Sequence, residues 1–267
     1  MQLQTPVNIP KATFHIQPKD KILFVGSCFA NNIGERFRDD NFDVIVNPYG
    51  VMYNPASVLH TVQQAITDGT IGSEGVDIAV FTLGTNHVYI LNETGEIVDN
   101  CQKRPQRLFT EKELTIEECC HYLDEATSLL LSRNPSTHII FTVSPIRYAK
   151  YGFHESQLSK ATLLLSVNNL QSSQRHYFPA YEIMNDELRD YRFYDTDMLH
   201  PSSQAVDYIH ERFIDTYFSS SARQYIEEWR PIRKALSHRP FNPESEEHKA
   251  FMQKVLSDKQ RFLEKWT

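Results

Sequence analysis

Two stretches of the sequence carry residue types that can cooperate in acyl transfer. Ser27 follows an apolar run that ends at Gly26, and Asp197 and His200 lie three residues apart, before a helix-like segment. A histidine can take the proton of a serine hydroxyl, and a carboxylate can hold the imidazole in the required tautomer. These residues therefore predict a serine nucleophile with a histidine base. The structural alternative is that Ser27 is a helix N-cap and that the aspartate caps a turn beside a surface histidine.

A third stretch could stabilise the negative charge that develops during such a reaction. Gly84 and Asn86 follow another apolar run. The N–H groups of Ser27 and Gly84, with the amide of Asn86, could form an oxyanion hole. The alternative is an ordinary turn after a strand.

Two neighbours compete for the predicted catalytic roles. Cys28 could be the nucleophile in place of Ser27, but we expect its side chain to pack within the first helix. Asp195 is the rival of Asp197 as the carboxylate that orients His200.

Strand patterns alternate with helical patterns along residues 1–218. Strands are predicted at 22–26, 43–46, 77–83, 137–143 and 177–178, a small hairpin at 89–98, and helices at 28–39, from about 55, and at 115–132, 156–174, 179–189 and 202–218. Such alternation, with apolar strands, indicates a parallel sheet covered by helices on both faces. Reactive groups of such sheets lie at the carboxyl ends of the strands. The two catalytic stretches and the oxyanion stretch are expected to meet at that edge.

The chain from about residue 219 breaks this alternation. Asn242 and Pro243 form a typical helix start. Phe251, Val255 and Phe262 then recur at helical spacing. We expect residues 219–267 to form a helical extension packed on the domain of residues 1–218, and the alternative is a surface for a partner or for a homo-oligomer.

Composition narrows the possible functions. The 267 residues carry a net charge of −7 and are 40% hydrophobic. This balance argues against general binding of nucleic acids or anionic membranes. The first residues lack the pattern of a signal peptide, and no run approaches the ~20 apolar residues of a membrane helix. The four cysteines form no metal-binding spacing, so we expect a cytoplasmic protein with free thiols and without metal or cofactor.

The first stretch reads GSCFA over residues 26–30, and the sequence resembles the GSCFA family, which is grouped with the SGNH/GDSL hydrolases. Further matching stretches are NPYGVMYNP (47–55), TLGT (82–85), TVSPIR (142–147), SKATLLL (159–165), the segment 177–202 and AVDYI (205–209). The resemblance implies a three-layer α/β/α fold with a compact parallel sheet of about five strands. It implies Ser27 as nucleophile, with Asp197 and His200 as its partners. It also implies that Gly50 joins Gly84 and Asn86 in the oxyanion hole.

The sequence departs from the family pattern at two places. Only about twenty residues separate Pro55 from Asp77, where the family usually carries a longer insertion. Gln102 stands where the family usually has a histidine. Substrate specificity therefore cannot be transferred. Arg147 and His87, which lie after predicted strands, are candidate substrate-binding residues, with a structural ion pair or a surface position as the alternatives.

These observations predict a metal-independent serine acyl hydrolase or acyltransferase. The expected substrate is a small acyl ester, with an acetylated carbohydrate suggested by the family resemblance. The alternative is a catalytically inactive SGNH-like module for binding or assembly. A nucleotide-binding domain is disfavoured, because no glycine-rich phosphate motif follows the first strand.

Overall fold

A five-stranded parallel sheet forms the centre of the computed structural model, which describes residues 4–242 and 245–266. Its strands are β1 (Lys21–Gly26), β2 (Asp43–Val46), β3 (Ile78–Leu83), β7 (His138–Val143) and β8 (Arg175–Tyr177). They lie in the order β2-β1-β3-β7-β8, and every neighbouring pair is parallel. The predicted parallel sheet is confirmed, with its fifth strand displaced toward the N-terminus.

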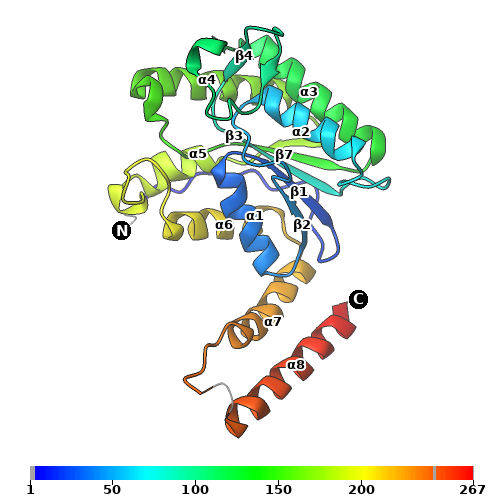
Figure 1. Ribbon diagram of the computed structural model, residues 1–267. Helices are drawn as coiled ribbons and strands as arrows, with labels where there is room; N and C mark the ends of the chain where they lie inside the picture. The colour runs from blue at the N-terminus through cyan, green and yellow to red at the C-terminus, as the bar shows by residue number, and fades with distance from the viewer. Residues whose placement is uncertain (1–3, 243–244, 267) are drawn as a thin grey trace.

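Helices cover both faces of this sheet (Figure 1). One face carries α1 (Cys28–Asp39) and α6 (Ser203–Tyr217), and the other carries α2 (Pro55–Thr67), α3 (Ile116–Arg133) and α4 (Phe153–Leu170). Successive side chains of a strand point to opposite faces. Accordingly, Phe24 packs with Phe37 of α1 in one buried cluster, whereas Leu23 packs with Leu123 of α3 in the other. The predicted three-layer α/β/α fold is confirmed.

Local capping explains where these helices begin. Asn54 accepts a hydrogen bond from the Ser57 N–H (2.9 Å) at the start of α2. At the start of α3, Thr115 and Glu118 form a reciprocal capping box. Because these residues satisfy N–H groups that lack partners within the helix, the helices start where the sequence places the caps.

A small antiparallel sheet lies beside the main one and was only half predicted. It contains β4 (His87–Leu91), β5 (Ile97–Val98) and β6 (Phe109–Glu113), in the order β5-β4-β6. The hairpin of β4 and β5 is confirmed, but β6 was missed. Its sequence FTEKE has one buried residue followed by four exposed ones, so it lacks the alternation that marks a half-buried strand.

The segment between β8 and α6 also differs from the single helix predicted at 179–189. It contains the short helix α5 (Ala180–Glu182) and a π-helical segment over Ile183–Leu188. Arg189 ends it in a left-handed backbone conformation (φ 47°).

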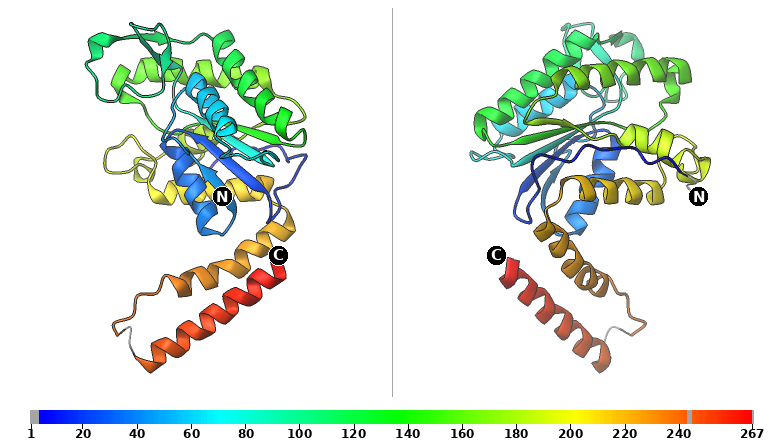
Figure 2. Two further views of the ribbon diagram at one scale, coloured as in Figure 1. Left: turned by 45° about the vertical axis from the view of Figure 1, so that its right-hand side comes forward. Right: turned by 180° about the vertical axis from the view of Figure 1, so that it is seen from behind.

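The end of the chain forms a hairpin of two helices, α7 (Ser220–Leu236) and α8 (Glu246–Trp266), which extends from the layer of α1 and α6 (Figures 1 and 2). Phe262 of α8 packs on Tyr225 and Trp229 of α7, with ring centroids 4.7 and 5.1 Å apart. The predicted helical extension is confirmed, although Pro243 of the predicted helix start lies outside the described residues. None of the described helices has the length and apolar character needed to span a lipid bilayer.

Candidate active site

Several of the predicted site residues follow the carboxyl ends of three neighbouring strands: Ser27 follows β1, Gly84 follows β3 and Arg147 follows β7. β1 ends at Gly26, β3 at Leu83 and β7 at Val143, and β3 lies between the other two. Gly26 has φ +144°, and a Cβ there would lie only 2.1 Å from Thr82 O. Glycine is therefore required where β1 turns beside β3. The structure confirms that the loops after these three strands share one edge of the sheet.

Asp197 and His200 form a direct pair in the loop before α6. Asp197 Oδ2 lies 2.5 Å from His200 Nδ1, and Oδ1 accepts the N–H groups of Leu199 (2.8 Å) and His200 (2.9 Å). The backbone N–H and the imidazole of His200 together lower the pKa of Asp197 to about 2. The carboxylate is thus ionised at neutral pH and fixes the ring through Nδ1. Within the described chain, His200 Nε2 has no hydrogen-bond partner.

The rival carboxylate, Asp195, has a different role. Its side chain accepts a hydrogen bond from the Thr196 N–H (2.7 Å), and its backbone N–H donates to His200 O (2.8 Å). Asp195 therefore shapes the loop, while Asp197 contacts the imidazole.

Arg147 attaches this loop to the end of β7. Its N–H donates to Leu199 O (3.0 Å), and its guanidinium donates to Met198 O (3.2 Å). The guanidinium also stacks on Phe153, 4.3 Å from the ring centroid, and faces Tyr194 at 5.6 Å. These contacts position the loop of residues 195–200, which we call the histidine loop. The substrate-binding role of Arg147 stays a prediction.

Ser27 is the N-cap of α1. The residue is fully buried, and its Oγ accepts the Phe29 N–H (3.3 Å) and lies 3.1 Å from Thr82 Oγ1. Its own N–H donates to Thr82 O (3.0 Å). This geometry is that of a helix N-cap, the alternative to a nucleophile, and the catalytic role of Ser27 stays a prediction.

Cys28 is more accessible than expected. It is partly exposed, whereas Ser27 before it and Phe29 after it are buried. Burial is the largest influence on its thiol and raises its pKa, while the N–H groups of Phe29 and of Cys28 itself, together with Lys160, act in the opposite direction. Asp197 is close enough to raise the same pKa further. Cys28 is thus less enclosed than expected, and two groups from other elements, Lys160 and Asp197, lie close enough to its thiol to affect its pKa.

The predicted oxyanion donors are already engaged. The N–H of Gly84 donates to Tyr53 O (2.8 Å), and the N–H of Gly50 donates to a carbonyl three residues earlier (2.9 Å). Asn86 is 3% exposed, and its Nδ2 donates to a backbone carbonyl after β6 (2.8 Å). With the Ser27 N–H also bonded, all four groups have protein acceptors in this conformation. The oxyanion-hole assignment stays a prediction.

Lys160 was missed as a possible functional residue. Its Nζ lies buried between the ends of β3 and β7 and donates to Gly84 O (2.7 Å) and Ser144 O (2.9 Å). Burial lowers its pKa to about 7. The sequence did contain a signal, since Lys160 shares the helical stripe of the buried residues Leu163 and Val167. A lysine on such a stripe is rarely buried without a specific role.

His87 belongs to the interior of the small sheet. It is 6% exposed, its ring stacks on Tyr151 at 3.9 Å, and its Nδ1 lies 3.3 Å from Glu111 Oε1. Its predicted contact with substrate would need the Tyr151 ring to move, and the assignment stays a prediction.

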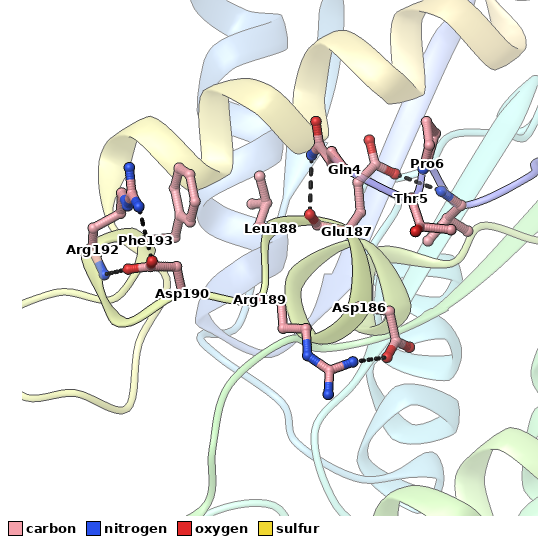
Figure 3. Close-up of a pocket in the computed structure, with 11 residues that line it drawn as sticks. Gln4, Thr5, Pro6, Asp186, Glu187, Leu188, Arg189, Asp190, Arg192 and Phe193 are labelled. Atoms are coloured by element: carbon pink, nitrogen blue, oxygen red, sulfur yellow. Dashed lines mark hydrogen bonds and ion pairs between the residues drawn. The ribbon is translucent and has the colours of Figure 1, made fainter. Parts of the chain in front are cut away.

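A large cavity of about 1040 Å³ lies between the N-terminal segment and residues 186–193 (Figure 3). Its polar groups pair with one another: Gln4 donates to Glu187 O (3.0 Å), and the Arg192 guanidinium donates to the Asp190 carboxylate (2.9 Å). The lining includes neither the histidine loop nor the β1–α1 turn. Among residues 4–242 and 245–266, no group of three histidine, cysteine or acidic side chains is placed to hold a metal ion.

Comparison with solved structures finds esterases of low similarity. An acetyl esterase mutant with an acetate ion is 10% identical, with 78% of this chain and 99% of that chain covered and a TM-score of 0.42. A carbohydrate esterase family 3 protein from Talaromyces cellulolyticus is 11% identical, with 78% of this chain and 99% of that chain covered and a TM-score of 0.42. An acetyl xylan esterase from the rumen bacterium Butyrivibrio proteoclasticus is 11% identical, with 78% of this chain and 64% of that chain covered and a TM-score of 0.38. These values are too low to transfer a substrate or a mechanism.

Comparison at the level of families is decisive. A search of curated proteins found no match. The model of the GSCFA family matches residues 21–76 and 70–213, and the model of the GSCFA domain protein, C-terminal domain, matches residues 229–267. The matched ranges include the β1–α1 turn, the ends of β3 and β7, and the histidine loop. Because these matches cover most of the chain, the protein belongs to the GSCFA family.

Proposed function

We propose that this protein is an acyl-ester hydrolase or acyltransferase that works through an acyl-enzyme. The Asp197–His200 pair carries the proposal: the carboxylate holds Nδ1 at 2.5 Å, and Nε2 has no partner within the described chain. A histidine held in this way can act as a general base toward a hydroxyl or thiol. The pair is attached to the end of β7, at the edge where the β1–α1 turn offers such a group.

The reaction would proceed in two halves. His200 Nε2 takes the proton of a nucleophile in the turn that contains Ser27 and Cys28, and the nucleophile attacks the acyl carbonyl. The protonated imidazole, stabilised by Asp197, then gives its proton to the departing alcohol. Water or another hydroxyl repeats the sequence on the acyl-enzyme. Water as acceptor makes the enzyme a hydrolase, and a sugar hydroxyl makes it a transferase.

The family resemblance supports a small acyl ester, such as an acetylated carbohydrate, as substrate. Tyr53 adds to this support. Its side chain is 41% exposed, and its carbonyl is held by the N–H groups of Gly84 and Thr85 at the edge of the sheet. An exposed aromatic ring on a fixed stretch of backbone suits the apolar face of a sugar. The four free thiols suit a reducing compartment, and we place the reaction in the cytoplasm.

The test is turnover of p-nitrophenyl acetate and acetate release from acetylated xylo-oligosaccharides. We expect His200→Ala to lower kcat/KM by about 10²–10⁴-fold, the usual contribution of a general base. His121→Ala is the matched control, because His121 is exposed on α3, where it lies 3.8 Å from Glu125. Equal activity of wild type and His200→Ala would refute the proposal.

One observation favours the alternative of an inactive binding or assembly module. The Ser27 hydroxyl is buried, and the predicted oxyanion donors are occupied by protein acceptors. In that case neither substrate would be turned over and no acyl group would become attached to the protein.

A further inference from the structure

We propose that the attacking atom is Cys28 Sγ and that Ser27 is the structural cap of the helix carrying it. The site would then be a cysteine–histidine–aspartate acyl-transfer site. This inference rests on the proposed function, because it assigns the nucleophile of that reaction.

Ser27 Oγ is poorly placed to attack a substrate. The residue has no exposed surface, and Oγ is engaged by the Phe29 N–H and by Thr82 Oγ1. The Ser27 N–H is also bonded, to Thr82 O, so that the whole residue is tied to the end of β3. Attack by Oγ would require this residue to leave its buried position and uncap α1. Among residues 4–242 and 245–266, the Cys28 side chain has no hydrogen bond comparable to those of Ser27 Oγ.

Cys28 is the first residue of α1 and the only partly exposed one of the three residues Ser27, Cys28 and Phe29. The N–H groups of Phe29 and of Cys28 itself act to lower the pKa of its thiol, against the larger effect of burial. The start of a helix favours negative charge, and a thiolate there is a common form of activated cysteine. Cys28 therefore occupies the place in the turn that a nucleophile needs, accessible and next to helix N–H groups.

The charges around the sulfur come from two other elements. Lys160 of α4 and Asp197 of the histidine loop both act on the Cys28 thiol. The Lys160 Nζ is held by Gly84 O and Ser144 O, so its position beneath the strand ends is fixed, and it is a cation there when protonated. A cation at this place stabilises a thiolate and the oxyanion that follows it. Because burial raises the pKa of the thiol, an adjacent base is needed to remove its proton, and His200 Nε2 is that base.

The chemistry balances without a further reactant. His200 Nε2 takes the Sγ proton while Sγ bonds to the ester carbonyl carbon, whose π electrons move to oxygen. Collapse of this intermediate breaks the bond to the alkoxy oxygen, which leaves with the proton from His200. Water then attacks the thioester, gives a proton to His200, and releases the carboxylic acid and the thiol.

The experiment compares Cys28→Ala, Ser27→Ala and Cys101→Ala with wild type. Cys101 is also partly exposed and serves as the matched control. We expect Cys28→Ala to lower p-nitrophenyl acetate turnover at least 100-fold, Ser27→Ala to remain within about tenfold, and Cys101→Ala to be unchanged. Intact mass after a short incubation should show one acetyl group that neutral hydroxylamine removes, as expected for a thioester.

A second measurement does not depend on the choice of substrate. We expect iodoacetamide to alkylate Cys28 at least tenfold faster than Cys101, and His200→Ala to slow the reaction at Cys28 alone. An acetyl group on Ser27, or full activity of Cys28→Ala, would overturn the inference while leaving the proposed function intact. Alkylation of Cys28 at the rate of Cys101, or at a rate indifferent to His200, would overturn it as well. Turnover indifferent to His200→Ala would instead refute the proposed function.

Discussion

The two oxygens of the Asp197 carboxylate have separate tasks. Oδ1 accepts two backbone N–H groups and so folds the loop, while Oδ2 faces His200 Nδ1. The carboxylate stays ionised down to a pH near its pKa of about 2, which the backbone and imidazole contacts of His200 set. Protonation of Asp197 therefore does not contribute to any loss of activity between pH 7 and pH 4.

This division of tasks predicts a specific effect of Asp197→Asn. The asparagine Oδ1 can keep both backbone contacts, which leaves Nδ2 facing His200 Nδ1. Two donors cannot share that contact, so the imidazole must take the tautomer with the proton on Nε2, which cannot act as a base. We expect kcat for p-nitrophenyl acetate to fall by about 10³–10⁴-fold with KM within a few fold, measured by steady-state kinetics.

The control for this prediction is Asp195→Asn in the same loop. The Asp195 side chain accepts the Thr196 N–H and does not contact the imidazole, so we expect kcat within about threefold of wild type. A larger loss in Asp195→Asn than in Asp197→Asn would contradict the assignment of the orienting carboxylate.

At the residue scale, the sequence predicts which side chains gather but not which of their atoms are available. The spacing of Asp197 and His200 indicated that the two side chains can meet in one loop, but the contact itself comes from the structure, in which Oδ2 lies 2.5 Å from Nδ1. Whether Ser27 or Cys28 presents its side chain depends on a non-local bond to Thr82. The same applies to the Gly84 N–H, whose acceptor, Tyr53, lies before α2. Such partners come from other parts of the chain and leave no local pattern.

At the scale of elements, the packing of α6 on α1 encloses a titratable group. His210 is 5% exposed, and its ring centroid lies 4.5 Å from that of Phe37. Burial, with smaller contributions from Arg36 of α1 and from Arg230 and Arg233 of α7, lowers its pKa to about 3. His210 is therefore neutral in the folded chain at every pH above about 4.

The depressed pKa of His210 predicts that acid weakens the fold. Below the unfolded pKa of ~6.5, His210 is protonated in the unfolded chain but stays neutral in the folded chain. The free energy of unfolding therefore falls as pH decreases. Between pH 7 and pH 5 this loss amounts to about 2 kcal/mol. We expect His210→Phe to lack this part of the pH dependence in urea unfolding at the two pH values.

Comparison between two pH values removes any packing cost of the larger ring from this test. His176, whose pKa is lowered to about 4 by burial and by His138, contributes equally to both proteins. The exposed His121→Phe variant should keep the wild-type pH dependence. Identical pH dependence in wild type and His210→Phe would show that His210 does not carry this effect.

The elements themselves were largely predictable, for a physical reason. Strands buried on both faces are apolar throughout, as in FVG before Ser27. The start of a capped amphipathic helix is marked in the sequence by its capping residues, here Thr115 and Glu118. β6 was not predictable, because Thr110, Glu111 and Lys112 are exposed and only pairing with β4 makes them a strand. The π-helical segment after α5 was missed because it has the composition of an ordinary helix.

At the scale of the whole molecule, α7 joins the terminal hairpin to the core. Trp229 is buried and donates from Nε1 to Asp39 O (2.7 Å), while Tyr225 donates to Asn41 O (2.7 Å). Arg233 pairs with the buried Asp40 at 3.1 Å. These contacts reach the turn between α1 and β2. The boundary at residue 218 stays a prediction, and so does self-association through α8, on which Leu256 is 55% exposed.

These contacts predict that the hairpin and the sheet unfold together. The only two tryptophans, Trp229 and Trp266, both lie in the hairpin, so their fluorescence reports on the hairpin and its contact with the core, whereas far-UV circular dichroism reports on the whole chain. We expect the two urea transitions to coincide, because α7 shares a buried cluster with α1 and β1. We expect Phe262→Ala to lower the free energy of unfolding measured by either probe by about 3–5 kcal/mol, because Phe262 is 5% exposed. Leu256→Ala should change it little, because Leu256 is exposed. A fluorescence transition that precedes the dichroism transition, with a wider gap in Phe262→Ala, would make the hairpin a separate unit.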